Sequence, residues 1–202
     1  MTRKGRQAFL FSTEGKITEM REVDIKRFAK HEAGHAVHFV LNFGERFEFV
    51  WVRRTDDEPV PEIPGHTSIE RSGKGGGVFF QPNPQLVTTT HALVASCMAG
   101  VAGERINRKK PGKFTFADIL AGAEGDWRQA RRHIQESNEQ GLSKRIITDE
   151  DRFMDVCFAD AWRQLKSLKP THEAVTQALI ERGMLTYDEV KAIINRTQGW
   201  NL

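Results

Sequence analysis

The residues of this chain best suited to chemistry are His31, Glu32 and His35, which form the pattern His-Glu-x-x-His. They fall in a stretch whose apolar residues recur at helical spacing, which predicts a helix over residues 24–44. Four residues advance a helix by about 400°, so His31 and His35 project from one face, one turn apart. Two imidazoles in this arrangement can bind one Zn²⁺, and Glu32 can accept a proton from a water held by that ion.

A catalytic zinc site needs a third protein ligand and an open fourth position. His38 shares nearly the same helix face as His31 but lies about 10 Å along the axis, which predicts a packed or surface histidine. Folding could bring His66 or His91 close, but spacing gives no reason to prefer either. The alternative interpretation of the motif is a solvent-exposed pair of helical histidines that binds no metal.

The rest of the chain predicts a mainly α fold with a small β element. Alternating apolar and polar residues predict strands over 47–53 and 66–70, separated by a proline-rich loop. The glycines of residues 73–77 lack the order of a phosphate-binding loop and predict a flexible turn. Further helices are predicted over residues 84–107, 116–120, 126–137, 149–168, 171–182 and 186–195. Small residues on one face of the 84–107 helix predict close approach of another helix.

Length and composition favour one globular domain. The 202 residues carry a net charge of +3, and 39% are hydrophobic and 28% charged, which excludes disordered, collagen-like and disulfide-rich classes. We expect residues 1–23 to be a lead-in and residues 24–202 to be a single domain. No apolar run is long enough for a transmembrane helix and no basic stripe is evident. The expected location is therefore cytoplasmic, without a membrane or nucleic-acid partner.

The segment His-Glu-Ala-Gly-His-Ala at residues 31–36 resembles the zinc helix of the FtsH-type peptidases, the proteolytic domain of the membrane-anchored AAA proteases. Residues 99–104, Ala-Gly-Val-Ala-Gly-Glu, are similar to the small-residue helix of that family, which ends in an acidic residue. Residues 122–126, Gly-Ala-Glu-Gly-Asp, are similar to its G-A-x-x-D segment. The resemblance covers residues 24–195 and implies a helical, zincin-like single domain.

The resemblance also implies roles for particular residues. Asp126 becomes the third zinc ligand, and its place at a predicted helix N-terminus favours an ionised carboxylate. The alternative for Asp126 is a plain helix cap. Glu104 is expected to accept a hydrogen bond from a histidine ligand, and its alternative is a surface ion pair with a Lys or Arg. Gly65, His66 and Thr67 resemble the edge strand that would hold an extended peptide, with His66 as a candidate to stabilise the oxyanion.

Two departures from the family bear on function. Its members carry transmembrane helices and an ATPase module, which we do not find in this sequence, and Arg105 stands where the family often has a second acidic residue. The expected activity is therefore an ATP-independent zinc metalloendopeptidase that cuts peptides or unfolded protein segments, with a separate unfoldase as a candidate partner. The alternatives are a catalytically idle zinc-binding module with a regulatory role, and a zinc hydrolase that acts on a non-peptide bond. The sequence predicts no oligomeric state.

Overall fold

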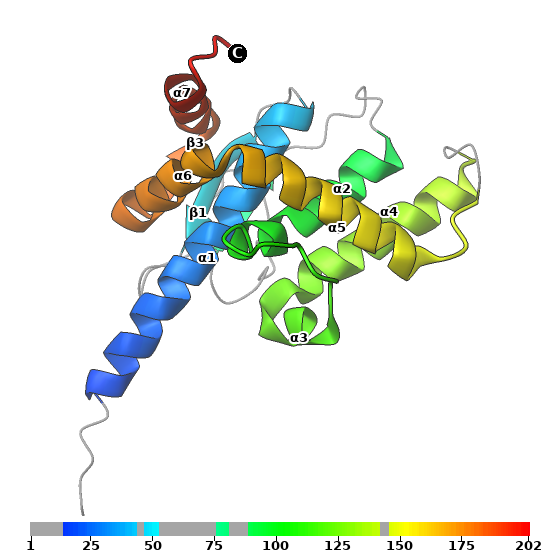
Figure 1. Cartoon of the computed structure of the whole chain (residues 1–202), viewed down its shortest axis with the longest axis horizontal. Coiled ribbons are helices and arrows are strands. Elements are labelled where there is room, and N and C mark those ends of the chain that lie inside the picture. The colour runs from blue at the N-terminus through cyan, green and yellow to red at the C-terminus, as the bar shows by residue number, and fades with distance from the viewer. Residues whose placement is uncertain (1–13, 44–46, 53–75, 81–88, 142–145) are drawn as a thin grey trace, which may run out of the picture.

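The computed structural model describes residues 14–43, 47–52, 76–80, 89–141 and 146–202, and over these ranges helices predominate (Figure 1). The elements are α1 (Glu14–Phe43), β1 (Phe47–Val52), β2 (Gly76–Phe80), α2 (Thr90–Glu104), α3 (Phe116–Asp118), the π-helical η1 (Ile119–Ala123), α4 (Glu124–Glu139), α5 (Glu150–Ser167), α6 (Lys169–Arg182), β3 (Met184–Thr186) and α7 (Tyr187–Gln198). A mainly helical fold with a small β element was predicted, and the structure confirms it.

The first helix is longer than the sequence pattern predicted. Helix α1 begins at Glu14, so residues 14–23, which were expected to belong to a lead-in, form the first turns of the helix instead. Glu, Lys, Met and Arg are frequent in residues 14–23, and these types favour helix even where no apolar period is present. Figure 1 shows these first turns projecting beyond the other elements, which explains why they carry no regular apolar stripe.

Helices α1 and α2 approach each other so closely that their backbones are almost in contact. A Cβ atom added to Gly34 would lie 2.3 Å from the carbonyl oxygen of Ala99. One added to Gly103 would lie 2.5 Å from the carbonyl oxygen of Lys30. Because only glycine fits at such contacts, the small-residue face predicted for α2 is confirmed. The predicted helix over 84–107 is shorter in the structure, and residues 84–88 lie outside the described ranges.

A three-stranded antiparallel sheet in the order β2-β1-β3 lies beside α1. The strand predicted over 47–53 is confirmed as β1, whereas the strand predicted over 66–70 lies outside the described residues. The predicted turn over 73–77 is wrong for Gly76 and Gly77, which pair in β2 with Val52 and Trp51. Strand β3 was not predicted, because its three residues are too few to show an alternation.

The chain between α2 and α4 forms an irregular segment. The short helix predicted over 116–120 is α3 followed by the π-helical turn η1, in which Gly122 has a φ of 120°. This left-handed backbone region favours glycine, and it redirects the chain into α4. Helix α4 begins at Glu124, so Asp126 lies in its first turn.

The C-terminal helices follow the predicted order. Asp149 caps α5 by accepting a hydrogen bond from the backbone N–H of Arg152 at 3.0 Å. Helix α7 begins with a capping box between Thr186 and Glu189. Helix α5 packs against α2, while α6 and α7 pack against α1. Among the described residues, no helix is both long enough and apolar enough to cross a membrane.

Candidate metal centre

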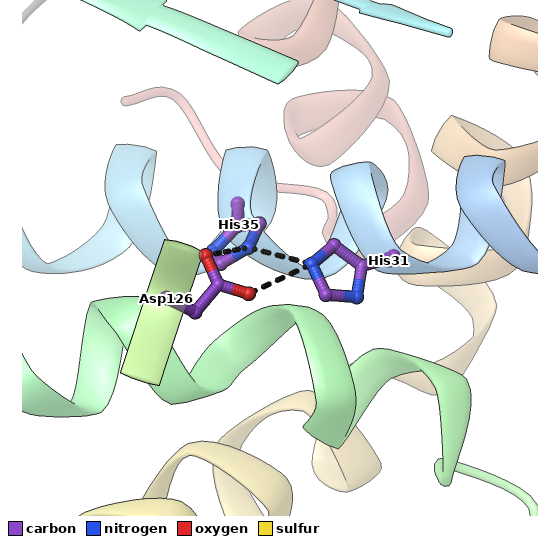
Figure 2. Close-up of side chains that lie close together, drawn as sticks. All are labelled: His31, His35 and Asp126. Carbon is purple, nitrogen blue, oxygen red and sulfur yellow. Dashed lines mark hydrogen bonds and ion pairs between the residues drawn. The ribbon is translucent and has the colours of Figure 1, made fainter. Parts of the chain in front are cut away.

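Three side chains converge where the first turn of α4 meets the middle of α1 (Figure 2). His31 Nε2 lies 2.9 Å from Asp126 Oδ2, and His35 Nε2 lies 3.4 Å from Asp126 Oδ1. The two Nε2 atoms are 3.1 Å apart. Donor atoms that share a tetrahedral Zn²⁺ at about 2.0–2.1 Å lie about 3.3 Å from one another. These separations therefore match a three-ligand set, although Asp126 is 95 residues from His31 in the chain.

The opposite nitrogen of each imidazole has an acceptor from α2. His35 Nδ1 donates to the carbonyl oxygen of Ser96 at 2.8 Å, and His31 Nδ1 lies 2.8 Å from Glu104 Oε1. Acceptors at Nδ1 favour the tautomer that leaves the Nε2 lone pair available, the arrangement common among metal-binding histidines. The carboxylate of Glu104 also forms an ion pair with Arg27. Glu104 therefore makes both the contact with a histidine ligand and the ion pair with an arginine that the sequence analysis gave as alternatives.

Gly100 keeps the space beside the two imidazoles open. A Cβ atom at this position would lie 2.3 Å from His31 Nε2 and 2.5 Å from His35 Nε2. Two histidine nitrogens and one carboxylate oxygen are typical zinc ligands, and a site with three protein ligands keeps one position for water or substrate. The donor set and the space beside it therefore both fit a Zn²⁺ ion bound by His31, His35 and Asp126.

The carboxylates around the histidines create a field that favours cations. Burial tends to lower the pKa of His31, but the charge and hydrogen bond of Asp126, the hydrogen bond of Glu104 and the charge of Glu32 raise this pKa well above its usual range. Burial tends to raise the pKa of Asp126, but His35 and His31 hold it well below its usual range. The same field that stabilises a proton on an imidazole would also stabilise a divalent cation held by these side chains.

Glu32 is buried beside the ligand set, with 7% of its surface exposed. Burial raises the pKa of its carboxyl, the charges of His31 and His35 lower it, and those of Asp126 and Glu104 raise it further. The pKa of Glu32 therefore depends on the charges of both histidines and of both neighbouring carboxylates. A carboxylate in this environment can exchange protons with a water or an amine at the site.

The other histidines and the peptide-binding residues considered from the sequence do not belong to the ligand set among the described residues. His38 is packed in the interior, and burial, followed by the charges of His35 and His91, lowers its pKa to about 3. His91 Nε2 interacts with Asp160 Oδ2 at 2.9 Å and is not part of the ligand set. Gly65, His66 and Thr67 lie outside the described residues, so the predicted peptide-binding strand and the oxyanion role of His66 stay predictions.

The structure gives Asp126 and Arg105 positions that decide between their alternative roles. The cap of α4 is Ala123, so the interpretation of Asp126 as a plain helix cap is wrong. Arg105 forms a nearly buried ion pair with Asp118 and donates to the carbonyl oxygen of Lys113 at 2.8 Å. It therefore holds the irregular segment before α4 instead of joining the ligand set.

Three contributors were missed by the sequence analysis: Arg27, Ser96 and Gly100. Arg27 precedes His31 by one helical turn, which was a usable signal, because residues four apart share a face. Ser96 contributes only its backbone carbonyl, so its side chain gave no indication. Gly100 was predicted to belong to a face for helix packing, but the space it leaves for the imidazoles was not foreseen.

Comparisons with known proteins give no family assignment. No protein-family model matches the chain, and no curated protein sequence matches it significantly.

Proposed function

We propose that this protein is a zinc metallopeptidase of the FtsH type that hydrolyses peptide bonds in peptides or unfolded protein segments. The observation that carries the proposal is the convergence of His31, His35 and Asp126 within 4.8 Å, with the buried Glu32 directly after His31 in the chain. The sequence resemblance of residues 24–195 supports the choice of a peptide bond as the substrate.

In this proposal the side chains have three roles: binding the ion, orienting its ligands and transferring a proton. His31, His35 and Asp126 would hold the ion, and the acceptors at both Nδ1 atoms keep the imidazoles oriented. A bound Zn²⁺ would supply Lewis-acid chemistry by lowering the pKa of a water and polarising the substrate carbonyl. Glu32 would accept the proton from the attacking water and donate it to the nitrogen of the leaving amine. This role requires a carboxylate and cannot be taken by the isosteric amide.

The test compares wild type with Glu32→Gln. We expect both proteins to bind one equivalent of zinc, because Glu32 is not a ligand, and we expect only wild type to degrade an unfolded, casein-like protein. Loss of a general base lowers the rate by roughly 10²–10⁴-fold. Zinc content by elemental analysis and release of peptides from the substrate are the two measurements.

Each result has a separate meaning. Hydrolysis retained by Glu32→Gln contradicts the mechanism. A zinc-loaded wild type that cleaves neither unfolded protein nor small amides and esters contradicts the enzyme proposal and favours the binding module. Turnover confined to small non-peptide amides or esters assigns the same site to a different hydrolase.

A further inference from the structure

A chain of three side chains crosses the contact between α1 and α2 behind the candidate ligand His31. Arg27 Nε donates to Glu104 Oε2 at 2.6 Å, and Arg27 Nη2 donates to Glu104 Oε1 at 3.4 Å. Glu104 Oε1 in turn lies 2.8 Å from His31 Nδ1. The guanidinium of Arg27 therefore contacts both carboxylate oxygens, and Oε1 also faces the imidazole of His31.

The position of Glu104 at the end of α2 means that its side chain needs a partner such as Arg27 to hold it in one conformation. Glu104 is the last residue of α2, and a glutamate side chain at a helix end has several rotamers open to it. Its side chain is 18% exposed, and those of Arg27 and His31 are 33% and 11% exposed. A planar guanidinium that contacts both carboxylate oxygens restricts the carboxylate to one plane. In that plane Oε1 faces His31 Nδ1.

We propose that Arg27 is a positioning residue of the metal centre, which acts through Glu104 to keep the Nε2 atom of His31 directed at the ion. This inference rests on the proposed zinc site but not on peptide hydrolysis. Residues that support a metal ligand typically change metal affinity by about 10- to 100-fold when they are replaced. Because Arg27 acts through one intermediate residue, we expect an effect near the lower end of that range.

The experiment measures the affinity of the purified full chain for Zn²⁺ by competition with a chromophoric chelator. We expect Arg27→Met, which keeps the apolar stem and removes the guanidinium, to weaken zinc binding by about tenfold. Arg27→Lys, which restores the charge without the planar fork, should recover part of that loss. Arg182→Met is the matched control, because Arg182 also pairs with a glutamate, Glu189, but lies on α6.

A double-mutant cycle separates positioning from general stability. If Arg27 acts through Glu104, the variant with both Arg27→Met and Glu104→Gln should bind zinc no more weakly than Glu104→Gln alone. A merely structural role would instead lower the melting temperature of Arg27→Met and leave its zinc affinity equal to that of Arg182→Met. Arg27→Gln is measured in parallel, so that a second folded variant is available if Arg27→Met does not fold.

Several results would overturn the inference. One is a zinc affinity of Arg27→Met or Arg27→Gln that lies within twofold of the Arg182→Met control. Another is a double-mutant cycle in which the losses of zinc affinity from Arg27→Met and Glu104→Gln are additive. Wild type that binds no zinc would overturn both this inference and the proposed function. Wild type that binds zinc but cleaves no substrate would overturn only the proposed function.

Discussion

At the scale of single residues, the candidate centre depends on an absent side chain as much as on those present. Gly100 faces both imidazoles, and any Cβ there would lie within 2.5 Å of a histidine nitrogen. The histidine rings can swing aside at small energetic expense, since they are the flexible ends of their side chains. A substitution at this position should therefore affect the metal site and spare the fold.

We predict that Gly100→Ala abolishes measurable zinc binding while the protein stays folded. Alanine in a helix interior is favoured over glycine by about 1 kcal/mol, which offsets part of any strain. Zinc binding is measured by chelator competition and folding by circular dichroism. The matched control is Gly125→Ala, because a Cβ there would meet nothing within 4 Å. Normal zinc binding by Gly100→Ala would show that the ion, if bound, does not require this space.

The ranking of the two acidic residues is a second prediction at this scale. Glu104→Ala should lower zinc affinity by about 10- to 100-fold, and Asp126→Ala should lower it by more than that range. The reason is that Asp126 lies within reach of both Nε2 atoms, whereas Glu104 contacts only the Nδ1 side of His31. Zinc occupancy after dialysis against a weak chelator measures the ranking. The reverse order would move the third ligand to Glu104.

At the scale of elements, the third ligand depends on the irregular segment that leads into α4. Arg105, at the end of α2, holds this segment by its ion pair with Asp118 and its hydrogen bond to the carbonyl oxygen of Lys113. The carbonyl oxygen of Arg105 also accepts a hydrogen bond from Trp162 Nε1 at 3.0 Å. These contacts join α2, α3 and α5 at one residue.

We predict that Arg105→Met lowers the free energy of unfolding by about 3 kcal/mol, because removal of one partner leaves the other charge nearly buried and unpaired. Urea denaturation monitored by tryptophan fluorescence measures this change. The variant that also carries Asp118→Asn removes the unpaired charge, keeps an oxygen that can accept from the backbone N–H of Thr115, and should recover part of the loss. A double variant less stable than Arg105→Met would show that the pair is not the source of the effect.

The elements also show how far the sequence could predict this structure. Helix α1 and strand β1 were predicted, since apolar side chains at the spacing of a helix or a strand reveal a buried face. The turns from Glu14 to Val23 and strand β3 were missed, because projecting turns and three-residue strands have no such pattern. The pair His31 and His35 was predicted from helix geometry alone. Asp126 came only from family resemblance, since no local rule relates residues 95 positions apart.

At the scale of the whole molecule, two interior histidines relate stability to pH. His172 is fully buried on α6, where Nε2 donates to the carbonyl oxygen of Lys30 at 2.8 Å and Nδ1 has no partner among the described residues. Burial lowers its pKa to about 4, against 6.5 in an unfolded chain. His38 is buried in the same way, and its pKa is lowered to about 3.

We predict that His172 contributes an acid sensitivity between pH 6.5 and 4. In this window the unfolded chain binds a proton that the folded chain does not, so the free energy of unfolding falls as pH decreases. The fall is at most about 1.4 kcal/mol per pH unit, and above pH 6.5 the contribution is complete. Urea denaturation at several pH values, for wild type and His172→Gln, isolates the term as the difference between the two slopes.

His91→Gln is the control for this prediction, because His91 has a side chain that is 44% exposed and pairs with Asp160. It shows how much of any change comes from exchanging a histidine for a glutamine in itself. Equal slopes for wild type and His172→Gln would mean that His172 is accessible to protons in the folded protein.

The backbone contact between α1 and α2 restricts how this chain can vary in evolution. Gly34 and Gly103 admit no side chain because backbone atoms block them, and Gly100 admits none if the imidazoles are to keep their places. A distant relative with the same centre can change most of its surface, but it should keep glycine at these three positions. A glycine inside the His-Glu-x-x-His motif, followed by Gly100 and Gly103 ahead of an acidic residue at position 104, therefore forms a search pattern that could find relatives that overall sequence similarity does not detect.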